Sequence, residues 1–105
     1  MNKALAELKD LVKYYQAKGQ PQKALSVLKE AIQLRPQEMS LRALLAQVYA
    51  QQGMKREAIA ELDALGEMQL EAGLRDEAVQ TVKQIIALEP ANVEAYRQLL
   101  DHIRR

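Results

Sequence analysis

The chain has 105 residues, of which 49% are hydrophobic and 28% are charged, and it contains no cysteine. That length suits a single folded domain, and the lack of cysteine excludes disulfides, thiolate metal sites and cysteine nucleophiles. Its 15 basic and 14 acidic residues are scattered and give a net charge of +1, which disfavours binding to nucleic acid or to an anionic membrane.

The composition favours an all-α fold. Phe and Trp are absent, there are only 4 Gly and 3 Pro, and the apolar residues are mainly Leu, Ala, Ile, Val and Met. The N-terminus lacks the apolar core of a signal peptide, and no apolar run exceeds four residues. We therefore expect a soluble, cytoplasmic protein without a membrane-spanning segment.

Turn residues are sparse and evenly spaced, and they divide the chain into helical segments. Between them, apolar residues recur at intervals of three and four, which is the period of an amphipathic helix. The connections are so short that neighbouring helices must be antiparallel. The turn residues are Gly19, Pro21, Pro36, Gly53, Gly73 and Pro90. The predicted helices cover residues 2–18, 21–34, 38–52, 55–72, 75–88 and 92–104.

The first four predicted helices contain an internal repeat. The stretches YYQAKGQPQKALSVL and VYAQQGMKREAIAEL are similar throughout. A shift of 34 residues superimposes Tyr15 on Tyr49, Gly19 on Gly53, Ala24 on Ala58 and Leu28 on Leu62. This pattern resembles the tetratricopeptide repeat (TPR), a helix-turn-helix unit of the same length. The resemblance implies antiparallel helical hairpins stacked as a short TPR-like solenoid.

The resemblance extends over nearly the whole chain. The second copy has Arg42 at the family's tryptophan site, and the third copy has Gln69 in place of the tyrosine. The last predicted helix resembles one more opening helix, with Tyr96 at the tryptophan-like site. We therefore expect one domain over residues 1–105. It comprises repeat one at about 5–38, repeat two at about 39–72, and a partial third repeat with a terminal helix at about 73–105.

The third copy overlaps the second. The interval between turn glycines is 34 residues from Gly19 to Gly53 but only 20 from Gly53 to Gly73. Two helices of about 12 residues and a turn do not fit in that space. Leu62 and Leu65 fit both a closing and an opening helix, so we predict one continuous helix over 55–72 that two repeats share. Each later helix should then run opposite to its direction in a regular array, which interrupts the superhelix.

The sequence offers no arrangement suited to catalysis. The only histidine, His102, lies beside Asp101, and adjacent helical residues do not face each other. There is no glycine-rich phosphate loop, no His-x-x-x-His pair and no acidic cluster with the spacing of metal ligands. We expect no enzymatic activity, no cofactor and no metal.

The four tyrosines fall into two groups. Tyr15 and Tyr49 match the family's buried packing tyrosine, and Tyr96 should also pack in the core. Tyr14 instead falls where the family usually has a small residue that contacts the preceding repeat. It either covers an open end, belongs to a segment of a longer array, or meets another chain.

The resemblance implies that a partner would lie along the inward face of the opening helices. Family members that clamp the carboxylate end of chaperone peptides have asparagines at the positions of Lys13 and Leu44, which disfavours that ligand here. The lysines of this face also fit an ordinary solvated helix surface. Carried over to this sequence, the face comprises Lys9, Lys13, Gln16, Ala43, Gln47, Ala50 and Gln51. Asp63, Glu67 and Leu70 join it if the long helix acts as an opening helix.

Three functions are compatible with this pattern. The first is a scaffold for protein-protein interaction that binds a peptide or a partner helix in its groove, with Lys9 and Lys13 favouring an acidic or amide-rich peptide. The second is a structural segment that forms a homo-oligomer through its open hydrophobic ends. The third, RNA binding, is disfavoured by the balanced charge.

Overall fold

A computed structural model of the protein describes residues 2–105, with side chains from residue 4 onward. This part of the chain forms six α-helices and no strand. The helices are α1 (Asn2–Ala17), α2 (Pro21–Leu34), α3 (Met39–Gln51), α4 (Lys55–Glu71), α5 (Arg75–Ala87) and α6 (Val93–Arg104). The all-α prediction is confirmed, and each helix end lies within one residue of the predicted one.

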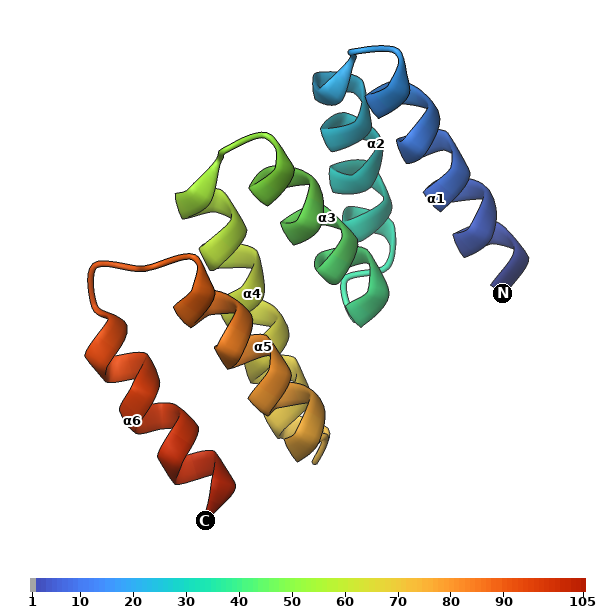
Figure 1. Cartoon of the computed structure of the whole chain (residues 1–105). Helices are drawn as coiled ribbons and strands as arrows, with labels where there is room; N and C mark the ends of the chain where they lie inside the picture. The colour runs from blue at the N-terminus through green and yellow to red at the C-terminus, as the bar shows by residue number, and fades with distance from the viewer. Residues whose placement is uncertain (1) are drawn as a thin grey trace.

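The helices stack in chain order as an elongated solenoid. Each helix packs on the helices before and after it, and successive helices are antiparallel (Figure 1). The principal extents are 42 × 29 × 18 Å, with α1 at one end of the long direction and α6 at the other. The predicted TPR-like solenoid is therefore present.

Three of the described helices end in the same way. α1, α3 and α4 are each followed by a glycine with positive φ, namely Gly19 (70°), Gly53 (73°) and Gly73 (77°), a conformation that glycine adopts without strain. After each glycine the next backbone N–H donates to a carbonyl five residues earlier, as Leu74 does to Gln69 at 2.8 Å. α4 thus ends as the opening helices α1 and α3 end.

The predicted shared helix is confirmed. α4 is continuous over 17 residues and contains no turn. Its Ala58, 0% exposed, packs in a cluster with residues of α1, α2 and α3. Leu62 and Leu65 form a second cluster with Ala46 of α3 and Ile85 of α5. One helix therefore closes the second hairpin and opens the next.

The predicted reversal after α4 is also present. Ala78 of α5 aligns with the closing-helix residues Ala24 and Ala58, and all three are fully buried. However, α5 runs in the same direction as the opening helices α1 and α3 (Figure 1). The small side chain of the closing helix is retained while the direction of the helix is inverted.

Two of the three tyrosines assigned to the core are only partly covered. Tyr49 is buried, whereas Tyr15 and Tyr96 are half-buried and pack against the edges of the core clusters. Tyr15 sits on α1, the outermost helix of the stack, and the Nζ of Lys23 lies 5.8 Å from the centre of its ring. Tyr15 therefore packs on the core as expected, but it stays partly exposed because α1 has a neighbouring helix on one side only.

Candidate functional site

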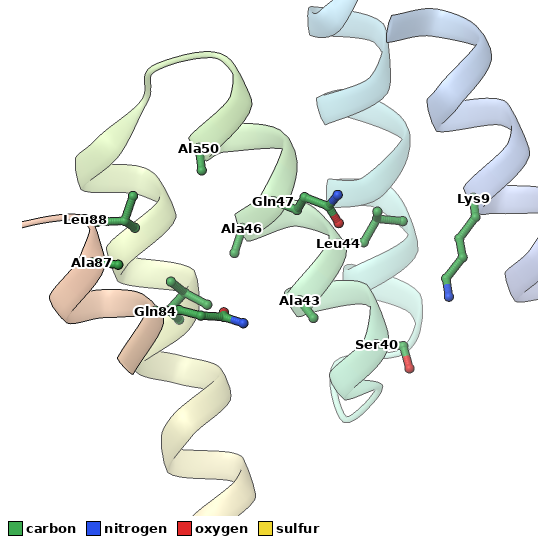
Figure 2. A pocket seen from close by; sticks show the side chains of 11 residues that line it. Lys9, Ser40, Ala43, Leu44, Ala46, Gln47, Ala50, Gln84, Ala87 and Leu88 are labelled. Atoms are coloured by element: carbon green, nitrogen blue, oxygen red, sulfur yellow. The ribbon is translucent and has the colours of Figure 1, made fainter. Parts of the chain in front are cut away.

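A groove crosses the surface of α3 between α1 and α5 (Figure 2). Its volume is about 550 Å³. Lys9 reaches it from α1 on one side, and the amide of Gln84 points into it from α5 on the other. The residues that line it are Lys9, Ser40, Ala43, Leu44, Ala46, Gln47, Ala50, Leu62, Gln84, Ala87 and Leu88.

The floor of this groove is built from small side chains on α3. Ala43 and Ala50 each project only a methyl group and are exposed. Ala46, between them, is buried against Leu62 of α4. Helical spacing of three and four residues places these alanines on one face of α3, which leaves room above an apolar surface.

A second, more polar hollow adjoins the groove. It has a volume of about 390 Å³ and shares Lys9, Leu44 and Gln47 with the groove. Within it, Gln16 Nε2 of α1 donates a hydrogen bond of 2.7 Å to Gln51 Oε1 of α3. The residues that line it are Lys9, Val12, Lys13, Gln16, Leu44, Gln47, Val48 and Gln51. We call the groove and this hollow together the trough.

The trough has a one-sided charge. Among the described residues that line it, only Lys9 and Lys13 are charged, and both are exposed. They lie one turn apart on α1, so both cations border the polar hollow. One end of the trough is therefore cationic and amide-rich, and the other is apolar.

The structure brings together seven of the ten residues proposed from the sequence. The trough contains Lys9, Lys13, Gln16, Ala43, Gln47, Ala50 and Gln51. Asp63, Glu67 and Leu70 of α4 are exposed and line neither part of it. Asp63 instead accepts a hydrogen bond from Tyr96 Oη of α6, which lies 2.9 Å from each carboxylate oxygen. A role for these two acidic residues in binding stays a prediction.

Sequence reasoning missed the contribution of α5. Gln84, Ala87 and Leu88 form one wall of the groove, although α5 occupies the position of a closing helix. The feature of the sequence that pointed to this wall was the predicted reversal after α4. An inverted α5 brings its last turn, rather than its first, to the groove. Ser40, Leu44, Ala46 and Leu62 complete the lining that was not predicted.

Titratable groups outside the trough form no reactive cluster in the described chain. His102 is exposed in the last turn of α6, and residues 2–105 contain no group of three or more His, Asp or Glu side chains that could hold a metal ion. Burial raises the pKa of Tyr96 to about 12, assisted by its hydrogen bond to Asp63 and by the charge of that carboxylate. None of the described helices has both the length and the apolar character needed to cross a membrane.

Comparison with known proteins supports the fold. The sequence profile of the tetratricopeptide repeat matches residues 15–70, and no curated protein matches the chain. The second TPR domain of human RPAP3, in complex with the HSP70 peptide SGPTIEEVD, is 20% identical with a TM-score of 0.50. The match covers 93% of this chain and 92% of that one.

Two further solved structures are similar. The first TPR of Spaghetti (RPAP3), bound to the HSP90 peptide SRMEEVD, is 21% identical with a TM-score of 0.51, covering 98% of this chain and 94% of the other. A thermophilic TPR protein from Thermus thermophilus is 28% identical with a TM-score of 0.42, covering 84% of this chain and 52% of the other. The two RPAP3 structures show the same fold as this chain.

Proposed function

We propose, because the chain belongs to the tetratricopeptide repeat family, that it is a protein-interaction scaffold that binds a peptide in the trough. The peptide carries an acidic side chain next to an apolar one. The observation that supports this proposal is the division of the trough into a cationic end and an apolar end. The role is one of binding rather than of catalysis.

The cationic end would select the acidic residue. Lys9 and Lys13 are exposed and no acidic side chain of the trough neutralises them, so a carboxylate can approach both ammonium groups. Gln47 and Gln51 offer amide donors on the facing helix. Because exposed charges are screened over about 8 Å at physiological ionic strength, this part of the affinity must fall as salt is added.

The apolar end would accept the neighbouring side chain. The methyl groups of Ala43 and Ala50 and the side chain of Leu88 surround a space of about 550 Å³, within the usual range for a ligand pocket. Burial of apolar surface contributes about 25 cal/mol per Å², so a leucine- or methionine-sized side chain would contribute most of the salt-independent affinity.

The related structures also support an acidic peptide. Both RPAP3 domains are solved with peptides that contain the residues EEVD. This chain has Lys13 and Leu44 where chaperone-clamping members of the family have asparagines. We therefore expect the preferred peptide to differ from these two, and SRMEEVD serves as a reference ligand of known composition.

The proposal is tested by selecting peptides from an unbiased display library and measuring their affinity by fluorescence anisotropy. The double variant Lys9→Glu/Lys13→Glu should weaken binding by about tenfold or more, a change of about 1.4 kcal/mol. The matched control is Lys55→Glu/Lys83→Glu, which reverses two exposed lysines outside the trough and should leave the affinity unchanged.

A second variant tests the apolar end. Ala43→Leu fills the floor of the groove from an exposed position, so it should reduce affinity without lowering stability. Circular dichroism should show an unchanged fold for every variant, since exposed substitutions usually change stability by less than about 0.5 kcal/mol. Selected peptides whose affinity ignores salt, the lysine reversal and Ala43→Leu would contradict the proposal.

A further inference from the structure

Exposed large apolar side chains occur in pairs at two places on the described surface. Leu11 and Tyr14 of α1 are 39% and 54% exposed, and Leu70 and Leu74, at the connection between α4 and α5, are 40% and 36% exposed. Leu34 and Leu99 are also exposed, but neither is paired in this way along the chain. Contiguous exposed apolar side chains mark interaction surfaces more often than single ones do.

The first pair has cations on its C-terminal side. The Nζ of Lys18 is 5.7 Å from the centre of the Tyr14 ring, and the centres of the Tyr14 and Tyr15 rings are 5.8 Å apart with the rings inclined at 61°. Lys23 is placed in the same way over Tyr15. Lys18 and Lys23 are the charged residues on the C-terminal side of Tyr14, whereas the exposed Glu7 and Asp10 lie one turn before Leu11 and Tyr14. We call Leu11, Tyr14 and Lys18 the tyrosine patch.

The second pair lies in an acidic setting. Residues 67–77 contain four carboxylates, all exposed, and one cation, Arg75. Glu67 and Glu71 are one turn apart on α4, with Leu70 between them in the sequence, and the other two carboxylates open α5. We call Leu70, Leu74 and Glu71 the leucine patch.

We propose that the tyrosine patch of one copy of this chain docks on the leucine patch of a second copy. Each patch joins exposed apolar side chains to charges, and the charges are of opposite sign, so the apolar groups become buried while lysines approach carboxylates. Within one chain the patches cannot meet. The C-terminal end of α1 and the α4–α5 turn lie at opposite edges of the molecule (Figure 1).

This geometry determines the kind of assembly. Two different patches meet, so the interface is head-to-tail, and each added copy leaves one free patch of each kind. The assembly therefore grows with protein concentration unless its rotation closes a ring. It also leaves the trough open, because Leu11 and Tyr14 lie on nearly the opposite side of α1 from Lys9 and Lys13.

Sedimentation velocity on the full chain over a wide range of concentration tests the proposal. The average mass should rise with concentration and fall as salt is added, since the charges of both patches are exposed. A protein that stays monomeric over the whole concentration range would overturn the proposal. The two patches would then be available only for contacts with other proteins.

Two variants distinguish this interface from any symmetric one. Leu11→Gln/Tyr14→Gln keeps an intact leucine patch, and Leu70→Gln/Leu74→Gln keeps an intact tyrosine patch. Alone, each should be monomeric, whereas an equimolar mixture should form a dimer that grows no further. The control Leu34→Gln changes a leucine that is 84% exposed and belongs to neither patch, so it should assemble as the unmodified chain does.

A charge exchange tests the same contact without removing apolar side chains. Lys18→Glu should weaken assembly of the chain, and mixing it with Glu71→Lys should restore growing assembly, because each patch then meets the opposite charge on the other variant. If either patch variant assembles as strongly as the unmodified chain, the proposal is wrong. All variants should still bind peptides selected for the trough, so failure of self-association is distinguishable from failure of the proposed function.

Discussion

The first three helices and the last three form the same kind of stack from different side chains. In the first half, the buried Tyr49 of α3 packs in the cluster that α3 forms with its neighbouring helices. In the second half, Gln69 takes the tyrosine position and Thr81 Oγ1 donates a hydrogen bond of 2.6 Å to its Oε1, with both residues buried. Both halves retain a fully buried alanine on the closing helix. The two halves therefore share the position of the buried alanine in the repeat, and they do not share the aromatic ring at the tyrosine position.

The largest expected effect tests that shared feature. Ala24→Leu, Ala58→Leu and Ala78→Leu each place three extra carbons at a site with 0% exposure, which should cost about 1 to 3 kcal/mol through overpacking. Urea denaturation should give similar losses in both halves. Ala60→Leu, at an exposed position of α4, is the matched control and should be nearly neutral. Three neutral core substitutions would show that the alignment of the two halves is wrong.

The next effect distinguishes the halves. Thr81→Val removes the donor to the buried Gln69 oxygen, and an unsatisfied buried acceptor costs about 1 to 3 kcal/mol. Adding Gln69→Leu should recover most of that loss, because no acceptor then remains. Thermal denaturation of the two single variants and the double variant measures the coupling. Simple additivity of the single effects would mean that the hydrogen bond does not stabilise the second half.

A smaller effect concerns the glycine inside the shared helix. Gly66→Ala should raise stability by about 1 kcal/mol, because alanine favours a helix and its Cβ would lie at an ordinary 3.7 Å from Thr81 Cγ2. Gly53→Ala provides the contrast. It has free space but a φ of 73°, so it should lower stability. Chemical denaturation would measure both, and a destabilised Gly66→Ala would show that the approach of α5 to α4 requires glycine.

The smallest effect concerns the contact between α4 and α6. The pKa of Tyr96 is raised to about 12 by burial and then by Asp63, so the folded state favours the neutral phenol. The resulting stabilisation is complete below the unfolded pKa of about 10 and is lost as pH rises toward 12. Asp63→Asn should lower the pKa of Tyr96, as measured by ultraviolet titration. Tyr96→Phe identifies the step, and an unchanged midpoint in Asp63→Asn would contradict the assignment.

The helices were predictable from the sequence because glycine and proline mark their ends. The shared helix followed from one short interval, Gly53 to Gly73, which leaves room for one helix only. The part of the trough on α1 and α3 was predictable from the resemblance to the tetratricopeptide repeat, which implies that the inward face of the opening helices is the binding surface.

The rest of the trough was not predictable, because it depends on tertiary geometry. Gln84 and Leu88 line the groove from α5 and its C-terminal end. The reversal after α4 indicates the direction of α5, but it does not indicate which side chains of α5 reach the groove. The half-burial of Tyr15 has a similar cause. The alignment of Tyr15 with Tyr49 assumes that the two side chains have equivalent neighbouring helices. The burial of each tyrosine depends instead on the helices that are present on each side of it.

The shared helix also changes how the molecule should come apart. A stack of separate repeats melts as a row of units, each able to fray while its neighbour stays folded. α4 gives Ala58 to one cluster and Leu62 to the other, so it cannot detach from one half without uncovering the other. Its backbone amides should therefore exchange with solvent only when the whole chain opens. Merging two helices into one converts a row of separable units into a single cooperative one.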